Sequence, residues 1–302
     1  MGQNPHLLME FDKSGAEWVV VAYASGDGQM IDVVKGNESP HSKTGMLISG
    51  APLELVEKEN DLVGHHTDPI EIESLRSANL SELLKGDYFL PRSMSIRQAG
   101  KKSNHGLNYG MGYRRFALEN EMDERDAKRI VDLYLHSAYP GIPVWWETIR
   151  GQLRDNRTLT NCFGRKREFR DAWGDELFKE AYAFIPQSTV VDMVNSGMAQ
   201  AFGDDSSAFQ RADLLAQVHD SIVYQYECEH FLDMALFSSR LAYEYMSPTI
   251  QYSGREFQIG TDLKVGKNWG GMISVDLTED IHQMQHNLEE AWDKLNASTQ
   301  AG

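Results

Sequence analysis

The sequence predicts an α+β fold with an antiparallel sheet, and three observations support this prediction. Residues 158–169 and 214–226 each contain two short strand-like runs around a tight turn, as β-hairpins do. Helical and hairpin segments occur in separate blocks rather than in alternation, which disfavours parallel βαβ units. The 302 residues are 41% hydrophobic and 25% charged, which is typical of one large or two small globular domains.

The first third of the chain mixes apolar runs with a polar insertion. Residues 17–23 (EWVVVAY) predict either a strand or a strand that turns into a helix. Residues 28–50 predict two helices, the second of which begins near His41. Residues 51–92 are polar and acidic and contain three prolines. We expect this segment to be an irregular insertion with one helix, at 74–84.

The middle of the chain predicts long helices and one hairpin. Residues 95–110 predict a helix that ends in a glycine-rich break, and residues 123–138 predict an amphipathic helix. A further helix is expected at 144–155. The hairpin at 158–169 turns at a glycine. Residues 175–202 predict another helix, in which a proline marks a bend or a first turn.

The last third of the chain predicts a hairpin, a helix and a glycine-rich strand. The hairpin at 214–226 carries His219 and Asp220 at its tip. A helix is expected at 229–245, and a strand followed by a loop at 260–271. The tail from Ser274 is acidic, and we expect it to end in a polar, frayed helix.

The formal net charge of −16 is distributed unevenly along the chain. Residues 1–96 contain 7 Lys/Arg and 15 Asp/Glu, residues 97–170 contain 15 and 9, and residues 171–302 contain 7 and 21. The total argues against a polyanionic partner, because phosphate backbones attract cations. The distribution instead shows a basic island of net charge +6 between two acidic segments, and this island is the part suited to phosphate contacts.

Composition excludes several classes of protein. The two cysteines, Cys162 and Cys228, exclude a disulfide-rich secreted scaffold and a four-cysteine zinc site. The sequence contains no run of about 18 apolar residues, so no membrane-spanning helix is predicted. The first ten residues lack the basic region followed by an apolar run that marks a signal peptide. We therefore expect a cytoplasmic protein without a membrane partner; the family resemblance described below implies a bacterial or phage-infected cell.

The most specific pattern in the basic island has a spacing of four residues. Arg97, Lys101, His105 and Tyr109 lie in the pattern R-x3-K-x3-H-G-x2-Y-G. On a helix this spacing places all four side chains in one slowly drifting stripe. Two cations suit the oxygens of a triphosphate, and the two rings suit a sugar or a base.

Two acidic residues lie beside apolar, strand-like runs. Asp12 precedes the run at 17–23, and Asp220 lies at the tip of the hairpin at 214–226. Such residues are most often turn formers. If the two carboxylates converge, however, they can hold two Mg²⁺ ions for displacement at phosphorus. His41 and Gln187 are weaker candidates, since isolated residues of these types are usually surface or core groups.

Together these residues resemble the motifs of family A DNA polymerases, the group typified by bacterial DNA polymerase I and related phage replicases. DKSGAE at 12–17, followed by SGD at 25–27, resembles the first catalytic motif. The pattern from Arg97 resembles the "O helix" motif of the fingers, and QVHD at 217–220 resembles the second palm motif. Four shorter matches agree in order, and they are ESPH at 38–41, FGRK at 163–166, PQST at 186–189 and VGKNWG at 265–270.

The resemblance implies a right-hand polymerase fold that is only partly present, with an antiparallel palm sheet and helical fingers. The implied division has four parts, which are a palm strand with the first motif at 1–30, mainly fingers helices at 31–200, a palm hairpin with the second aspartate at 201–273 and an acidic tail at 274–302. The fingers part includes the insertion at about 51–92 and the hairpin at about 158–170.

The resemblance also implies roles for individual residues. Asp12 and Asp220 would hold two Mg²⁺ ions, and Lys101 would join them in the catalytic group. The residues implied to contact the incoming dNTP are Arg97, Lys101, His41, His105, Tyr109 and Glu17, of which Glu17 would be the steric gate against a 2′-hydroxyl. The residues implied to contact primer-template DNA are Gln187, His219, Arg165 and Lys166.

Several positions depart from the family pattern. His105 replaces the usual Phe or Tyr, and Ser221 replaces the glutamate that usually follows the second metal-binding aspartate. Lys179 and Ala183 lie where polar DNA contacts are usual. The family's thumb and exonuclease precede the first motif, whereas about 11 residues precede Asp12 here. We therefore expect either a fragment or a chain completed by a second polypeptide.

Two alternatives stay open from the sequence. A single-subunit RNA polymerase shares the aspartate pair and the R-x3-K helix, and His219-Asp220-Ser221 is closer to its phage form. Glu17 argues against this reading, because an enzyme that uses ribonucleotides should lack the gate. A catalytically weak, DNA-binding subunit of a replication complex is the other alternative, and the intact Asp12 and Asp220 argue against it.

Overall fold

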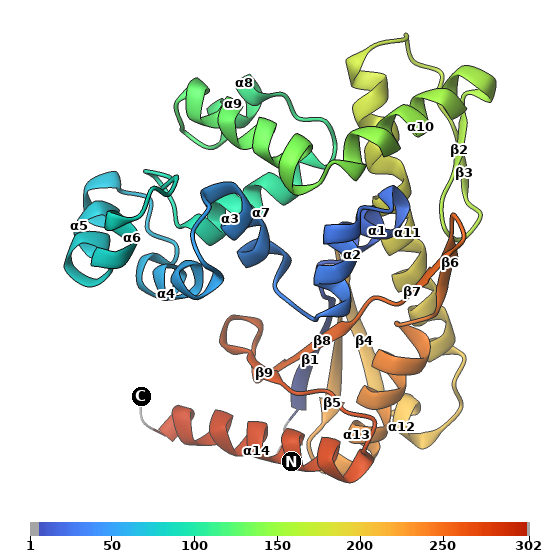
Figure 1. The fold of residues 1–302 in the computed structure, drawn as a ribbon. Helices are drawn as coiled ribbons and strands as arrows, with labels where there is room; N and C mark the ends of the chain where they lie inside the picture. Colours follow the sequence, from blue (N-terminus) through green and yellow to red (C-terminus); the bar gives the residue numbers. More distant parts are fainter. Residues whose placement is uncertain (1–5, 301–302) are drawn as a thin grey trace. The chain divides into compact units, whose positions relative to one another are not determined.

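The computed structural model describes the backbone of residues 6–300 and the side chains of residues 6–297. The chain forms two compact units (Figure 1). Unit 1 contains the residues up to Ala16 and those from Gln187 onward, and unit 2 contains Glu17–Pro186. Among the described residues, no helix combines the length and the apolar character that a membrane span requires.

Unit 1 is built on a five-stranded sheet in which every neighbouring pair is antiparallel, and this confirms the predicted fold class. The strand order is β4-β5-β1-β8-β9. The strands are β1 (His6–Lys13), β4 (Ala212–Val218), β5 (Ser221–Glu227), β8 (Thr261–Gly266) and β9 (Ile273–Val275). The predicted hairpin at 214–226 corresponds to β4 and β5.

The central strand β1 shows why this sheet forms. Its residues alternate between a buried and a half-buried face, and Leu7, Met9 and Phe11 are fully buried. Phe11 packs edge to face against Tyr224 of β5 and Phe237 of α13 (Phe231–Arg240). The opposite face of β1 carries the polar side chains of the candidate site.

The remaining elements of unit 1 are the helices α12 (Ser207–Gln210), α13, which continues into the π turn η2 (Leu241–Tyr245), and α14 (Ile281–Gln300), the hairpin β6 (Ile250–Tyr252)–β7 (Arg255–Phe257) and the short turn η3 (Trp269–Gly271). The predicted helix in the C-terminal tail is confirmed as α14, although one of its faces is apolar and buried. Helix α14 packs against α13 and buries Met284, Leu288 and Ala291 at helical spacing.

Unit 2 is mainly helical. Its elements are α1 (Ala16–Ser25), α2 (Gly28–Lys35), α3 (Pro40–Ser49), α4 (Leu53–Val63), α5 (Pro69–Asn79), α6 (Ser81–Lys85), α7 (Ile96–Leu107), α8 (Tyr113–Glu119), α9 (Glu124–Leu133) with the π turn η1 (Tyr134–Ala138), α10 (Gly141–Asn156), and the hairpin β2 (Thr158–Thr160)–β3 (Lys166–Glu168). Helix α11 (Asp175–Phe202) begins in this unit and ends in unit 1.

Two sequence-based expectations for this region are corrected. Residues 17–23 are helical rather than extended, and the strand is the preceding segment, β1. The run from Trp18 to Tyr23 is buried on every side, so its apolar pattern carries no helical period. The insertion at 51–92 is not irregular, because it folds into α4, α5 and α6. Pro52 precedes α4 and Pro69 opens α5.

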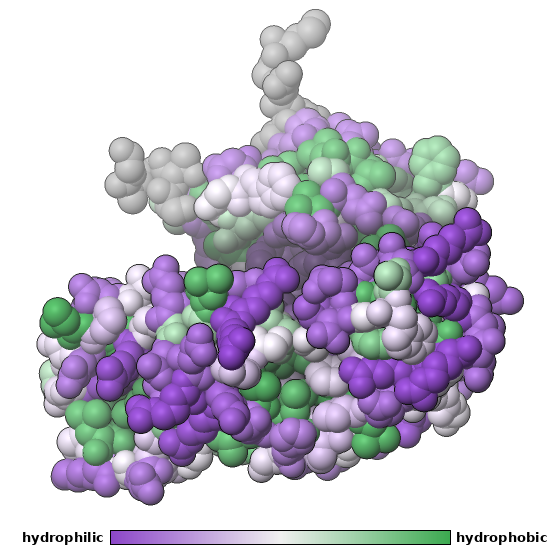
Figure 2. Space-filling model, turned by 90° about the horizontal axis from the view of Figure 1, so that it is seen from above, coloured by the Kyte–Doolittle hydropathy of each residue, from purple (hydrophilic) through white to green (hydrophobic). Residues whose placement is uncertain are grey.

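The surface of the protein is predominantly polar on the face drawn in Figure 2. Hydrophobic residues there occur in small groups separated by hydrophilic ones. Small apolar groups of this kind are normal on protein surfaces.

Candidate active site

The two predicted metal-binding aspartates lie at the same end of the unit 1 sheet. Asp12 is the last residue but one of the central strand β1, and it pairs in register with Ser221 of β5. Asp220 immediately precedes Ser221, in the two-residue turn between β4 and β5. His219, the other turn residue, has a φ of +54°, which tightens this reversal. The hairpin register therefore places Asp220 next to the strand position opposite Asp12.

The electrostatics of this end of the sheet favour a cation. Burial raises the pKa of Asp12 to about 6, and the nearby negative charge of Asp220 adds to this shift. Glu10 and Asp262 raise the same pKa further, whereas Lys264 opposes them. Asp262 lies directly opposite Asp12 on β8. A divalent cation would relieve this repulsion.

The donor set fits magnesium. Carboxylate oxygens are hard ligands, and Mg²⁺ in proteins is commonly held by one or two carboxylates together with water and substrate phosphates. Asp12 and Asp220 supply such a pair. Among residues 6–297, no cluster of three or more His, Cys, Asp or Glu side chains forms a complete metal cage.

Sequence reasoning missed the buried Lys13. Its Nζ donates to the carbonyl oxygens of Met246 and Ile259, both at 2.7 Å, and to Oγ1 of Thr261 at 2.8 Å. Burial lowers its pKa to about 7, against the opposing effect of Asp262 and the two aspartates. These bonds join the end of β1 to β8 and to the segment after η2, so Lys13 positions the backbone of Asp12. The signal in the sequence is a lysine on the buried face of an alternating strand.

The nucleotide-binding candidates lie in unit 2, on α7. Ser95 caps this helix by accepting from the backbone nitrogen of Gln98 at 3.2 Å. Arg97 is half-buried, and Lys101 and His105 are exposed on the same face. The predicted stripe of four is corrected to three, because α7 ends at Leu107 and Tyr109 lies in the turn that follows.

A close helix contact brings His41 to this stripe. Helices α3 and α7 touch at two glycines, and a Cβ added to Gly100 would lie 2.2 Å from the carbonyl oxygen of His41. A Cβ on Gly45 would lie 2.8 Å from the carbonyl oxygen of Ile96. The rings of His41 and His105 are consequently 5.8 Å apart between centroids. Sequence reasoning did not identify these two glycines.

His41 is part of one cationic patch. Burial lowers its pKa to about 4, and the charges of Arg97, His105 and Lys101 lower it further. The side chain is therefore neutral at pH 7. Its Nδ1 lies 3.2 Å from Nδ2 of Asn104. The patch combines a neutral imidazole with the permanent charges of Arg97 and Lys101.

We expect His41 to make unfolding dependent on pH. Its folded-state pKa of about 4 lies below the ordinary 6.5, so the unfolded chain binds the proton more tightly. The neutral His41 therefore contributes on the order of 1–3 kcal/mol to the free energy of unfolding above pH 6.5. This contribution is lost as the pH falls toward 4. Urea unfolding of wild type and His41→Asn at pH 7 and pH 5 measures it.

Asp12 acts in the opposite direction, because its raised pKa removes stability as pH rises from about 4 to 6. That term is common to both proteins and cancels in the comparison. The wild type should lose more stability than His41→Asn between pH 7 and pH 5, and exposed His282→Asn should behave like wild type. Equal losses in wild type and His41→Asn would contradict the burial of a neutral His41.

Glu17 and Tyr109 lie together in unit 2. Glu17 is in the first turn of α1, and its carboxylate accepts a hydrogen bond from the hydroxyl of Tyr109. Burial, followed by the charge of Glu17, raises the pKa of Tyr109 well above its usual range. Glu17 and Tyr109, both of which the resemblance implies as dNTP contacts, are thus in direct contact.

The predicted DNA contacts are exposed. Arg165 and Lys166 lie in the turn and at the start of β3 in unit 2. Gln187 on α11 and His219 in the β4–β5 turn are exposed in unit 1. Near the hairpin, Arg167 pairs with Glu180 at 2.6 Å. The basic island therefore has exposed cations in this hairpin, among which Arg167 forms an ion pair.

Known proteins that are similar to this chain are DNA polymerases. The family model for DNA polymerase family A matches residues 91–271, which is more than half of the chain. The chain is 24% identical over 269 residues to the thermostable DNA polymerase I of Thermus aquaticus, covering 87% of this chain and 27% of that protein. DNA polymerase I of Lactococcus lactis subsp. lactis (strain IL1403) is also 24% identical, with 87% and 26% coverage.

Among solved structures, the POL domain of Pol1 from M. smegmatis, in complex with DNA primer-template and dNTP, has the same fold, with a TM-score of 0.63 at 17% identity. The match covers 89% of this chain and 41% of that one. The fold is that of a polymerase domain. The chain belongs to DNA polymerase family A, and it spans about a quarter of the length of the curated relatives described above.

Proposed function

We propose that the chain is the catalytic module of a template-directed DNA polymerase, which adds dNTPs to a primer 3′-hydroxyl. The observation that carries this proposal is the pairing of Asp12 with the Asp220 hairpin in a chain of this family. The relatives are named DNA polymerase I, and the similar solved structure was determined with primer-template and dNTP. Primer-template DNA and dNTPs are therefore the proposed partners.

Asp12 and Asp220 would hold two Mg²⁺ ions. Bound there, the metal would lower the pKa of the primer hydroxyl and stabilise charge on the transferring phosphoryl group and pyrophosphate. The residues of the chain prepare that site. Lys13 holds the end of β1 against β8, and the mutual repulsion of the carboxylates keeps cation binding favourable.

Arg97 and Lys101 would bind the triphosphate as permanent cations, and Lys101 is the proposed catalytic residue among them. The neutral His41 would donate a hydrogen bond to a phosphate oxygen. His105 would contact the sugar in place of the usual Phe or Tyr ring. Gln187 and His219 would contact the primer-template DNA. The hairpin residues Arg165 and Lys166 would contact the sugar-phosphate backbone of that DNA.

Ser221 cannot replace the missing glutamate as a charged ligand. Its hydroxyl donates to the carbonyl oxygen of Val218 at 3.0 Å, which closes the hairpin turn. It also lies 3.4 Å from the Glu10 carboxylate. The serine therefore supports the conformation of the turn that carries Asp220, whose own carboxylate is the proposed ligand.

We expect Glu17→Ala to raise ribonucleotide incorporation. The carboxylate bound to Tyr109 would occupy the space that a 2′-hydroxyl needs, and alanine would open it. The ratio of dNTP to rNTP incorporation, measured for single additions to a primer, should fall by about tenfold or more if the lost discrimination is worth at least about 1.4 kcal/mol. The exposed Glu57→Ala serves as control. An unchanged ratio would remove the gate from the proposal.

Primer extension with Mg²⁺ tests the proposed function. Because the chain spans about a quarter of its relatives, the assay should be run with the chain alone and with a polypeptide that supplies the remaining polymerase regions. Extension with dNTPs supports the proposal. Extension with rNTPs instead would favour the RNA polymerase reading, and DNA binding without extension in either form would favour a non-catalytic subunit.

A further inference from the structure

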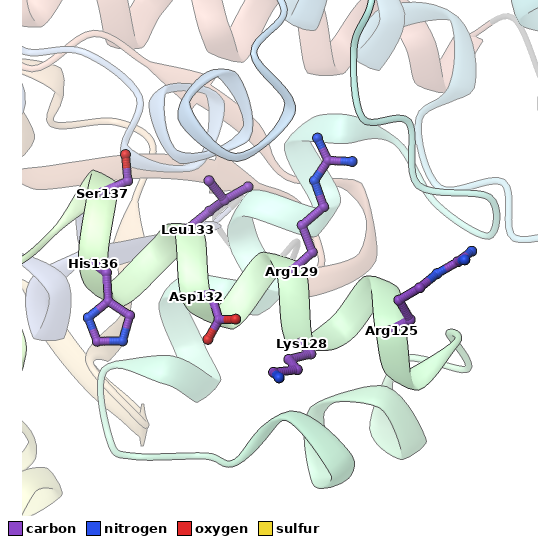
Figure 3. Close-up of a pocket in the computed structure, with 7 residues that line it drawn as sticks. All are labelled: Arg125, Lys128, Arg129, Asp132, Leu133, His136 and Ser137. Atoms are coloured by element: carbon purple, nitrogen blue, oxygen red, sulfur yellow. The ribbon is translucent and has the colours of Figure 1, made fainter.

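A shallow hollow in unit 2 runs along α9 and its π turn η1 (Figure 3). Two rows of side chains, each at a spacing of four residues, form its surface. The rows are Arg125, Arg129 and Leu133, and Lys128, Asp132 and His136. Spacing of four places successive members about 6 Å apart along the helix. Each row therefore presents its side chains at regular intervals along the axis of α9.

The cations of this hollow differ from most others in the unit. Arg125 and Lys128 are exposed, and neither forms an ion pair with any described residue. The guanidinium of Arg129 lies over the ring of Phe89 at 5.3 Å, a contact that leaves its N–H donors accessible. Asp132 is the single carboxylate of the hollow, so the local charge is positive.

Several other arginines of unit 2 have acidic partners. Arg115 contacts Glu119 at 2.6 Å, and Arg150 contacts Glu147 at 2.5 Å. Weaker pairs join Arg114 to Glu124 and Arg154 to Glu147, both at 3.9 Å. Carboxylates thus neutralise the charge of these four arginines, whereas Arg125, Lys128 and Arg129 of the hollow form no ion pair with a described residue.

The helix is held rigidly behind these cations. Ala127 and Ile130, on the opposite side of α9, are fully buried, and so is Tyr134 in η1. Single π turns of this kind are rare and occur frequently at functional sites. The exposed rows are therefore presented on a fixed support rather than on a loop.

We propose that this hollow binds the backbone of single-stranded nucleic acid, as the unpaired part of the template strand. This proposal rests on the proposed function, which supplies the nucleic acid. The cations of Arg125 and Arg129, one helical turn apart, pair with neighbouring phosphates, Lys128 of the second row supplies a further cation beside them, and Leu133 contacts a sugar or base next to Arg129. A single phosphate would use one of these groups, whereas a single-stranded chain uses the whole row.

The test is fluorescence anisotropy of a labelled oligo(dT) with the full chain, without Mg²⁺ or dNTP. The variant is Arg125→Gln/Lys128→Gln/Arg129→Gln. The control, Arg114→Gln/Arg115→Gln/Arg154→Gln, removes the same charge from the same unit at exposed, paired positions. We expect the variant to lose about tenfold or more in affinity, with a slope of log K against log salt that falls by about 2, since each phosphate contact in a single strand contributes about 0.7.

The control should lose less than about threefold in affinity, because paired surface cations contribute little on removal. Equal losses in variant and control, or no loss in the variant, would overturn the proposal. So would a wild-type chain that does not bind oligo(dT), or displacement of oligo(dT) by an acidic peptide at equal charge concentration, which would assign the hollow to a protein partner. Circular dichroism of both variants confirms that they fold.

The binding assay separates this inference from the proposed function. Asp220→Asn should bind oligo(dT) like wild type, because Asp220 is outside the hollow. A chain that binds oligo(dT) through the hollow but never extends a primer would contradict the proposed function alone. A chain that extends a primer equally well with and without the three cations, and binds oligo(dT) equally, would contradict the hollow alone.

Discussion

Replacing Asp220 with asparagine is expected to abolish nucleotide addition and leave the fold intact. The substitution keeps the size of the side chain and its place in the β4–β5 turn, but it removes one of the two carboxylates at the end of the sheet. Loss of a single group that stabilises transition-state charge commonly costs about 10²–10³-fold in rate, and loss of a metal ligand should cost at least as much. Single-turnover incorporation with saturating primer-template measures the effect.

A matched control is Asp213→Asn, which removes an exposed carboxylate from β4 of the same sheet. Its incorporation rate should stay within about twofold of wild type. The thermal unfolding midpoint of Asp220→Asn should not fall, because the change removes a like charge that raises the pKa of Asp12. Wild-type incorporation by Asp220→Asn would show that Asp220 is not a metal ligand.

Arg76→Met is expected to be the most destabilising single change in unit 2. The Arg76 guanidinium and the Glu59 carboxylate are almost completely buried, with side-chain exposures of 5% and 0%. Arg76 Nε donates to Glu59 at 3.0 Å, and its other nitrogens donate to the carbonyl oxygens of Pro91 and Met94. Methionine would leave Glu59 as an uncompensated buried charge, which costs about 3–5 kcal/mol.

The effect should extend to the nucleotide-binding helix. The second carboxylate oxygen of Glu59 accepts a hydrogen bond at 2.9 Å from the backbone nitrogen of Ile96, the first residue of α7. The pKa of Glu59 is raised by burial even with Arg76 present. Without Arg76, the carboxylate should take up a proton and lose part of its ability to hold the start of α7.

Urea unfolding measures the loss in the free energy of unfolding of Arg76→Met. Two further variants serve for comparison. The exposed ion pair of Lys58 and Glu54 provides the control, since Lys58→Met should cost less than about 1 kcal/mol. The double variant Glu59→Gln/Arg76→Met should recover part of the loss, because it removes the unpaired charge. A loss of less than about 1 kcal/mol in Arg76→Met would contradict the structural role of the pair.

Local pattern was sufficient for much of the fold. The turn of two residues between two apolar runs correctly predicted the hairpin that carries Asp220, and the helical pattern at 95–110 predicted α7. The apolar pattern placed the first strand at 17–23, whereas the strand that contains Asp12 is β1 at His6–Lys13. Its short alternation ends in a buried lysine, and only the long-range partners of Lys13 make that burial possible.

In the candidate site, too, local spacing was informative and long-range contacts were not predictable. Spacing alone grouped Arg97, Lys101 and His105, because they share one helix face. It could not show that His41 joins them, since this depends on the contact of Gly45 with α7. The helical insertion escaped prediction for a related reason. Its polar sequence hides a small core and the buried Glu59, whose partner is 17 residues away.

The most direct test of the central claim is a matrix of single-nucleotide additions. Four primer-templates that differ only in the templating base are each incubated with one dNTP and Mg²⁺, in the presence of the remaining polymerase regions. A template-directed polymerase adds the complementary dNTP to each primer and loses this activity in Asp220→Asn. Addition that ignores the templating base, or addition that persists unchanged in Asp220→Asn, would contradict the assignment.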